Sequence, residues 1–104
     1  MDANEAVRRD DLFLLDVREH DEWRAGRVTG AHHIPLRELG ARQAEIPSDR
    51  PVLCVCRSGS RSGMVVRALR DAGYDAHNLD GGLQAWVADG HDLVDEDGGT
   101  GEVI

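Results

Sequence analysis

The stretch Val52-Leu53-Cys54-Val55-Cys56 runs directly into the loop Arg57-Ser58-Gly59-Ser60-Arg61. Its first half is a continuous apolar run of strand length, which predicts a strand buried on both faces. Apolar residues then recur at helical spacing from Ser60 to Ala72, and Gly73 supplies a helix stop. A buried strand joined by a short loop to an amphipathic helix is typical of an α/β protein with a parallel sheet.

The rest of the chain continues this alternation of strands and helices. Further extended segments are predicted at Leu12–Val17, His33–Pro35 and Ala76–Leu79, and further helices at Ala3–Arg9, Asp21–Gly26, Leu36–Ile46 and Gly82–Gly90. Because the strands show no alternation of apolar and polar residues, helices should cover both faces of the sheet. The sequence therefore predicts an α/β fold with one parallel sheet between two helical layers.

Length and composition indicate one domain. A chain of 104 residues with 40% hydrophobic content suits one compact unit and leaves no room for a second of ordinary size. We expect residues 1–94 to form that domain. Residues 95–104 are acidic and Gly-rich with little apolar surface to bury, so we expect them to be a disordered tail.

The charge and hydropathy of the chain argue against two classes of partner. A net charge of -8 would repel nucleic acid and anionic membranes. No apolar stretch approaches the roughly 18 residues of a membrane helix, and the acidic residues 1–5 lack the features of a signal peptide. We expect a cytoplasmic protein, and a monomer because no long exposed apolar stripe is predicted.

The two cysteines are predicted to differ in role. Cys54 lies inside the apolar run and is expected to pack in the core, whereas Cys56 borders a polar loop at the carboxyl end of the strand. Ligands of parallel sheets bind at that end. A disulfide between thiols two positions apart in one strand is geometrically awkward, and two such thiols cannot supply the four ligands of a zinc site. We therefore expect a reactive thiol at Cys56 and no metal.

The loop after Cys56 has the features of an anion-binding site. Its glycine and small serines allow successive main-chain N–H groups to point inward, and the helix that follows adds roughly half a positive charge at its amino end. Two arginines flank the hollow. Such surroundings favour a thiolate, with pKa values of about 3.5–7.5. Cys56 is thus the predicted nucleophile, and the predicted substrate-binding residues are Arg57, Ser58, Gly59, Ser60 and Arg61.

Asp16 is predicted to support the site. It lies inside an apolar strand, where an unpaired carboxylate would cost several kcal/mol. It must therefore accept hydrogen bonds or pair with an arginine such as Arg18. We expect this pair to act as a structural brace near Cys56.

Four segments resemble motifs of the rhodanese family, in the family's order. They are Leu14–Glu19, Glu22–Pro35, Cys56–Arg61, which is similar to the family's six-residue active-site loop, and Leu79–Trp86. The resemblance covers nearly the whole chain. Two departures are that Arg27 stands where the family often has His, and that the amino terminus is short, so we expect the opening edge strand to be missing or minimal.

The resemblance implies both a fold and an activity. The fold would be a three-layer α/β structure with a parallel sheet of about five strands. The activity would be sulfur transfer, in which Cys56 takes sulfane sulfur from thiosulfate or a persulfide and passes it to a thiol or cyanide. Because the sulfur is carried covalently, no external cofactor is expected. The expected partners are a small anionic sulfur donor and a small or protein thiol acceptor.

Two alternatives stay open beside a thiosulfate sulfurtransferase. One is a rhodanese-like sulfur carrier or regulatory docking module with little activity on thiosulfate. The other, less favoured, is a phosphatase or arsenate reductase, which also uses a cysteine in an anion-binding loop. Those related loops place an arginine six positions after the cysteine, where this chain has Ser62, and Arg61 comes one position earlier.

Overall fold

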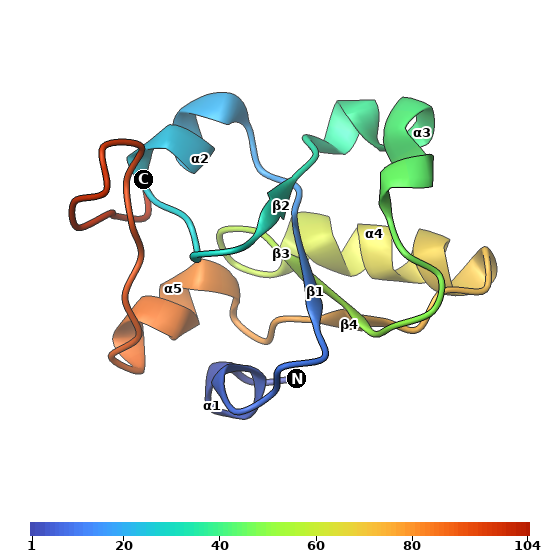
Figure 1. Ribbon diagram of the computed structural model, residues 1–104, viewed down its shortest axis with the longest axis horizontal. Coiled ribbons are helices and arrows are strands. Elements are labelled where there is room, and N and C mark those ends of the chain that lie inside the picture. Colours follow the sequence, from blue (N-terminus) through green and yellow to red (C-terminus); the bar gives the residue numbers. More distant parts are fainter.

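The computed structural model describes residues 1–104 and consists of one sheet with helices around it (Figure 1). The strands are β1 (Phe13–Asp16), β2 (His32–His33), β3 (Val52–Val55) and β4 (Ala76–Asn78). The α-helices are α1 (Ala3–Val7), α2 (His20–Ala25), α3 (Leu39–Arg42), α4 (Ser60–Asp71) and α5 (Gly82–Ala88). The 3-10 turns η1 (Leu36–Glu38) and η2 (Gln43–Glu45) flank α3, so the single helix expected at 36–46 is broken into three short pieces.

The sheet has four parallel strands in the order β2-β1-β3-β4. The α/β class and the parallel sheet are confirmed, but the expected count of about five strands is wrong. Only Met1 takes the place of a further strand beside β4: its amine donates to the carbonyl of Asn78 at 3.0 Å, and its carbonyl accepts from the N–H of Asp80 at 2.8 Å. Asp2 caps α1, which begins at Ala3, so the chain leaves the edge of the sheet directly after Met1.

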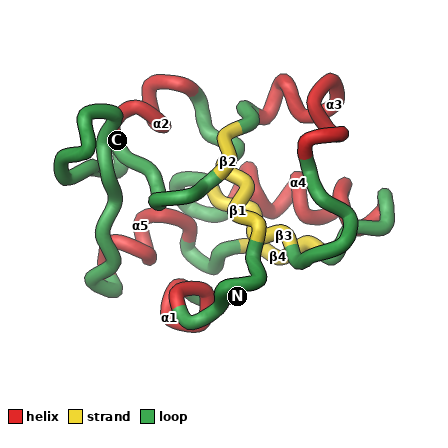
Figure 2. Tube along the Cα trace, in the orientation of Figure 1, coloured by secondary structure: helices red, strands yellow, loops and turns green.

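Two apolar clusters lie on opposite faces of the sheet, and β3 contributes to both. Val52 and Cys54 belong to the cluster beneath α4, and Leu53 and Val55 to the cluster beneath α1 and α5. The alternation follows from the strand itself, because successive side chains point to opposite faces. Figure 2 shows the strands at the centre with helices on both sides, which is the predicted three-layer arrangement.

The carboxyl-terminal segment differs from the expected disordered tail. Val94 forms antiparallel bridges with Arg27 and Thr100, and the N–H of Glu102 donates to the carbonyl of Ala25 at 2.9 Å. Val103 packs against the cluster that contains α5. Composition alone missed these contacts, because they depend on a few main-chain bonds and one apolar side chain.

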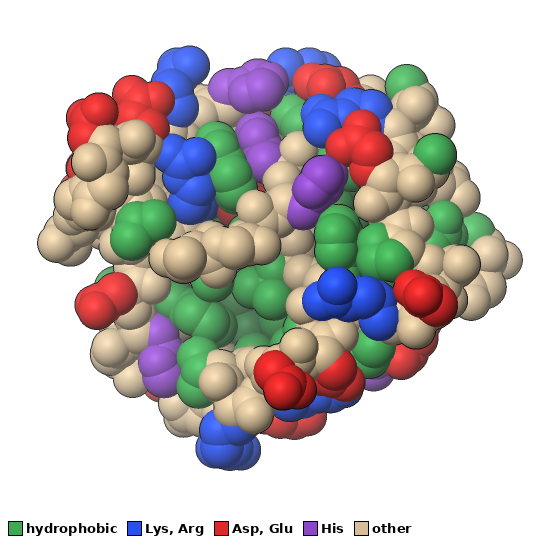
Figure 3. Space-filling model, in the orientation of Figure 1, with side chains coloured by type: hydrophobic (Ala, Val, Ile, Leu, Met, Phe, Trp, Pro, Cys, Tyr) green, Lys and Arg blue, Asp and Glu red, His purple; other side chains and the backbone are tan.

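The surface and the helices carry two further properties. On the face drawn in Figure 3, acidic and basic side chains are interspersed, so the net charge of -8 is not gathered into one patch there. None of the helices combines the length and the apolar character that crossing a lipid bilayer demands.

Candidate active site

Cys56 lies directly after β3, at the carboxyl edge of the sheet, and its sulfur is surrounded by hydrogen-bond donors. The N–H of Gly59 lies 3.1 Å from Sγ, the N–H of Ser62 3.4 Å, and the Ser62 hydroxyl 3.2 Å. The residue is 1% exposed. Buried hydrogen bonds to a charged acceptor are strong, so this arrangement favours sulfur in its thiolate form.

The loop can curl around the sulfur because Gly59 adopts a left-handed backbone conformation with φ of 102°. Residues with a Cβ rarely take that conformation. The turn directs the N–H of Gly59 to the sulfur, and α4 begins immediately afterwards at Ser60. The first turn of this 12-residue helix therefore points its free N–H groups at the site.

The amino end of α5 fixes the loop from the other side. The N–H of Leu83 donates to the carbonyl of Cys56 at 2.9 Å, and the N–H of Gln84 donates to the carbonyl of Arg57 at 3.0 Å. Gly82 allows this close approach, since a Cβ there would lie 2.5 Å from the Arg57 carbonyl oxygen. With these two carbonyls held by α5, the loop presents its N–H groups inward.

The two thiols have opposite acid–base properties. Burial raises the pKa of the Cys56 thiol, but hydrogen bonds from the Ser62 hydroxyl and from the N–H groups of Ser62, Gly59 and Ser58 outweigh it, so the pKa lies below its usual 9.0. Burial raises the pKa of Cys54 to about 12, with a small opposing contribution from Arg70. Both cysteines are free thiols. Cys56 is accordingly the more acidic of the two thiols, and Cys54 packs in the core.

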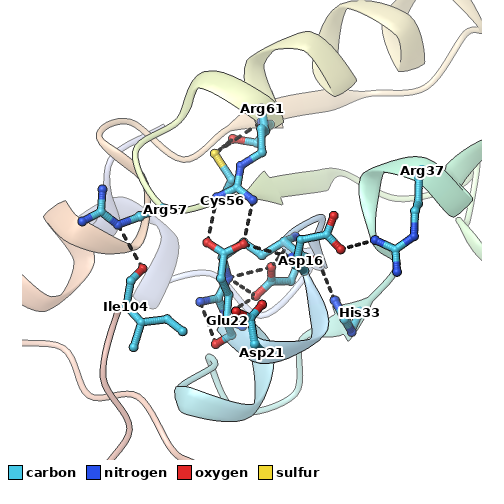
Figure 4. A network of polar contacts seen from close by, with 12 residues as sticks. Asp16, Asp21, Glu22, His33, Arg37, Cys56, Arg57, Arg61 and Ile104 are labelled. Carbon is cyan, nitrogen blue, oxygen red and sulfur yellow. Dashed lines mark hydrogen bonds and ion pairs between the residues drawn. The ribbon is translucent and has the colours of Figure 1, made fainter.

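Arg61 is tied to an acidic partner. Its Nη1 and Nη2 atoms donate to Glu22 of α2 at 2.7 and 2.8 Å, in a two-pronged ion pair (Figure 4). The ion pair lowers the pKa of Glu22 and raises that of Arg61. The sequence predicts that Arg61 binds substrate, whereas in the structure its charge is paired with Glu22.

The remaining predicted loop residues lie at the surface. Arg57 is exposed, and its Nε donates to the carbonyl of Ile104 at 3.0 Å. The side chains of Ser58 and Ser60 are also exposed, and neither makes a hydrogen bond through its hydroxyl. Of the two, Ser58 contributes to the site through its main-chain N–H, which lowers the pKa of Cys56.

Asp16 and Arg18 form the buried pair that the sequence analysis expects. Both are 0% exposed, and Arg18 donates to Asp16 from Nε at 2.9 Å and from Nη2 at 2.8 Å. Arg18 also donates to the carbonyls of Gly26 at 2.6 Å and Glu22 at 3.2 Å. The pair thereby connects β1 to α2, the helix that carries the acidic partner of Arg61.

The model of the rhodanese-like domain family matches residues 2–89. This chain belongs to that family. The resemblance of the four motifs is therefore confirmed, and the fold agrees with it. A rhodanese-related protein from Thermoplasma volcanium has a TM-score of 0.83 and 28% identity, covering 90% of this chain and 95% of that one.

Curated relatives extend the comparison for this rhodanese-like domain. A protein named sulfurtransferase from Allochromatium vinosum is 37% identical over 90 residues, which cover 86% of this chain and 84% of the relative. The uncharacterised protein YqhL of Bacillus subtilis is 42% identical over 74 residues, which cover 70% of this chain but only 59% of YqhL. The chain thus spans less than two thirds of some of the relatives it matches.

Three residues of the rhodanese-like site escaped sequence reasoning: Glu22, Ser62 and Asn78. The Ser62 hydroxyl lies 2.6 Å from Asn78 Oδ1, and Asn78 Nδ2 donates to the carbonyl of Gly59 at 3.0 Å. Ser62 carried a usable signal. It precedes Val65, Val66 and Leu69 by three, four and seven positions, which places a buried hydroxyl on the inward face of α4.

Proposed function

We propose that this rhodanese-like domain is a sulfurtransferase in which Cys56 carries sulfane sulfur as a persulfide. The observation that supports this best is the set of donors around Sγ: two main-chain N–H groups and the Ser62 hydroxyl, all within 3.4 Å. Donors fixed by the fold stabilise a thiolate before reaction and an anionic sulfur after it.

The chemistry has two steps that balance without a cofactor. The Cys56 thiolate attacks the outer sulfur of the donor, a new S–S bond forms at Cys56, and the donor S–S bond breaks. Its electron pair leaves on sulfite when the donor is thiosulfate, or on a thiolate when it is a persulfide. An acceptor thiolate or cyanide then attacks the outer sulfur and releases the Cys56 thiolate.

Phosphate chemistry is disfavoured by the loop itself. The arginine comes five positions after Cys56, and the sixth position is Ser62, whose hydroxyl contacts the sulfur. Arg61 is also bound to Glu22, so the charge of that arginine is already paired and is less available to clamp a phosphoryl group. The name of the sulfurtransferase from Allochromatium vinosum is consistent with sulfur as the transferred group.

Intact mass after incubation with thiosulfate or a small alkyl persulfide tests the proposal. We expect the protein to gain one sulfur atom, to lose it on addition of cyanide or a thiol, and to gain none after Cys56→Ser. Cys54→Ser serves as the matched control and should still be loaded. Hydrolysis of an aryl phosphate faster than sulfur transfer would contradict the proposal.

A further inference from the structure

The charge of Arg61 is neutralised inside the protein. Both of its terminal nitrogens are occupied by Glu22 carboxylate oxygens, and the Glu22 side chain is only 13% exposed. In Figure 4 the two side chains meet beside Cys56, Arg61 reaching from the amino end of α4 and Glu22 from α2. The guanidinium therefore lies beside Cys56 with its charge already paired to a carboxylate, which weakens its attraction for an incoming anion.

Glu22 is held in position by other contacts. Its Oε1 accepts the N–H of Glu19 at 3.0 Å, and its own carbonyl accepts from Arg18 at 3.2 Å. Arg18 in turn is fixed by Asp16, so the two charges of that pair cancel each other. The remaining basic residue of the loop, Arg57, is exposed and directs its Nε toward the carbonyl of Ile104.

The two classes of sulfur donor place different charges at this position. When the Cys56 thiolate attacks thiosulfate, the one negative charge of the thiolate and the two of thiosulfate come together in the site. The leaving sulfite carries two of these three charges away. Attack on a neutral alkyl persulfide, R–S–SH, gathers one charge and releases it on R–S⁻, with the proton kept on the new Cys56 persulfide. Main-chain N–H groups stabilise either complex, but the complex that carries three charges gains more from a nearby unpaired cation than the complex that carries one.

We propose that Glu22 is a specificity-determining residue, which pairs with Arg61 so that the site favours persulfide donors over thiosulfate. This assignment rests on the proposed sulfur transfer through Cys56. The persulfide donor is a thiol-bound sulfane sulfur, on a small molecule or on a protein cysteine. Release of Arg61 from Glu22 would give the site an unpaired positive charge beside Cys56, which would favour binding of thiosulfate.

The test compares two donors in single-turnover loading of Cys56, followed by intact mass. Wild-type protein and the Glu22→Gln variant are each loaded with thiosulfate and with cysteine persulfide. Glutamine keeps an oxygen for the N–H of Glu19 but loses the charge that holds Arg61. We expect the ratio of the thiosulfate rate to the persulfide rate to rise by about tenfold in Glu22→Gln. The matched control is Asp21→Asn, an exposed neighbour on α2 with the same charge change, and its ratio should stay at the wild-type value.

A double variant, Glu22→Gln with Arg61→Gln, separates pairing from simple repulsion. If Glu22 acts by occupying Arg61, the gain for thiosulfate disappears in the double variant. A gain that persists there overturns the assignment. Should Glu22→Gln unfold, as judged by circular dichroism, Glu22→Asp keeps the charge but shortens the reach and should raise the ratio to a smaller extent.

The remaining outcomes distinguish this inference from the proposed function. If both donors load wild-type Cys56 but Glu22→Gln leaves their ratio unchanged, the specificity role of Glu22 is wrong while sulfur transfer stands. If neither donor loads wild-type Cys56, the proposed sulfur transfer fails and this assignment fails with it.

Discussion

The Ser62 hydroxyl lies 3.2 Å from Cys56 Sγ and is buried together with it. The same oxygen lies 2.6 Å from Asn78 Oδ1, and a hydroxyl has a single hydrogen for these two acceptors. When Cys56 is a thiol, the hydrogen can go to Asn78. When Cys56 is a thiolate, donation to the sulfur stabilises the negative charge.

Ser62→Ala should raise the pKa of Cys56. One hydrogen bond to a charged group is lost, and we expect a shift of about one pH unit, equivalent to ~1.4 kcal/mol. The measurement is the pH dependence of iodoacetamide alkylation of Cys56. Because the thiolate is the reacting form, alkylation slows as pH falls through the pKa, and this fall should begin at higher pH in the variant. Ser48→Ala, at an exposed position, is the control. An unshifted profile would mean that the main-chain donors alone set the pKa.

The two thiols should differ in reactivity toward the same reagent, because their pKa values are shifted in opposite directions. With its pKa raised to about 12, Cys54 stays protonated, and native protein at pH 8 should incorporate one label, on Cys56. Unfolded protein should incorporate two. Cys54→Ser should cost roughly 1–3 kcal/mol of stability, because the added hydroxyl is buried without a partner, and should leave sulfur transfer in place. If a well-folded Cys54→Ser lost turnover while Cys56 still took up sulfur, Cys54 would be a resolving thiol.

Asp16→Asn should destabilise the fold strongly. The change leaves the Arg18 guanidinium, 0% exposed, without its counter-ion, and breaking one side of a buried pair costs about 3–5 kcal/mol. Urea unfolding of the variant measures this loss, with the exposed Asp49→Asn as control. Replacing both partners, with Asp16→Leu and Arg18→Met, should recover part of the stability, because no uncompensated charge then remains buried. A loss below about 1 kcal/mol for Asp16→Asn contradicts the bracing role.

Gly82→Ala should disturb the loop as well as the backbone. Its φ is 64°, and the new Cβ would meet the carbonyl carbon of Arg57 at 2.6 Å, which forces α5 away from the loop. Gly90 is a matched control, because its φ is 89° and a Cβ there meets nothing within 4 Å. Both alanine variants should lose about 1–3 kcal/mol of stability from backbone strain, but only Gly82→Ala should also slow the loading of Cys56. Equal loading rates in the two variants would show that α5 does not organise the loop.

The sequence predicted those features of the fold and the site that depend on residues close together in the chain, and missed those that depend on contacts between distant residues. Cys56 and its loop were predictable because a buried strand and an amphipathic helix adjoin them directly in the sequence. The pairing of Asp16 with Arg18 followed from the cost of a buried charge. The contact between Glu22 and Arg61 joins residues 39 positions apart and depends on where α2 lies, so no local pattern indicated it. The packed carboxyl-terminal segment likewise depends on a few long-range contacts of Val94, Glu102 and Val103, and the missing fifth strand on the contacts of Met1 with β4 and the residues after it.

The use of main-chain groups around Cys56 has a consequence for how this loop can diversify. The amides at Ser58 and Ser60 belong to the loop, but their hydroxyls project into solvent and hold nothing in place. Substitutions at these two positions can therefore change the exposed surface of the loop, which an acceptor protein would contact, without changing the hydrogen bonds to Cys56 Sγ. A randomised library at Ser58 and Ser60 would consequently be the natural starting point for redirecting the domain to a new acceptor.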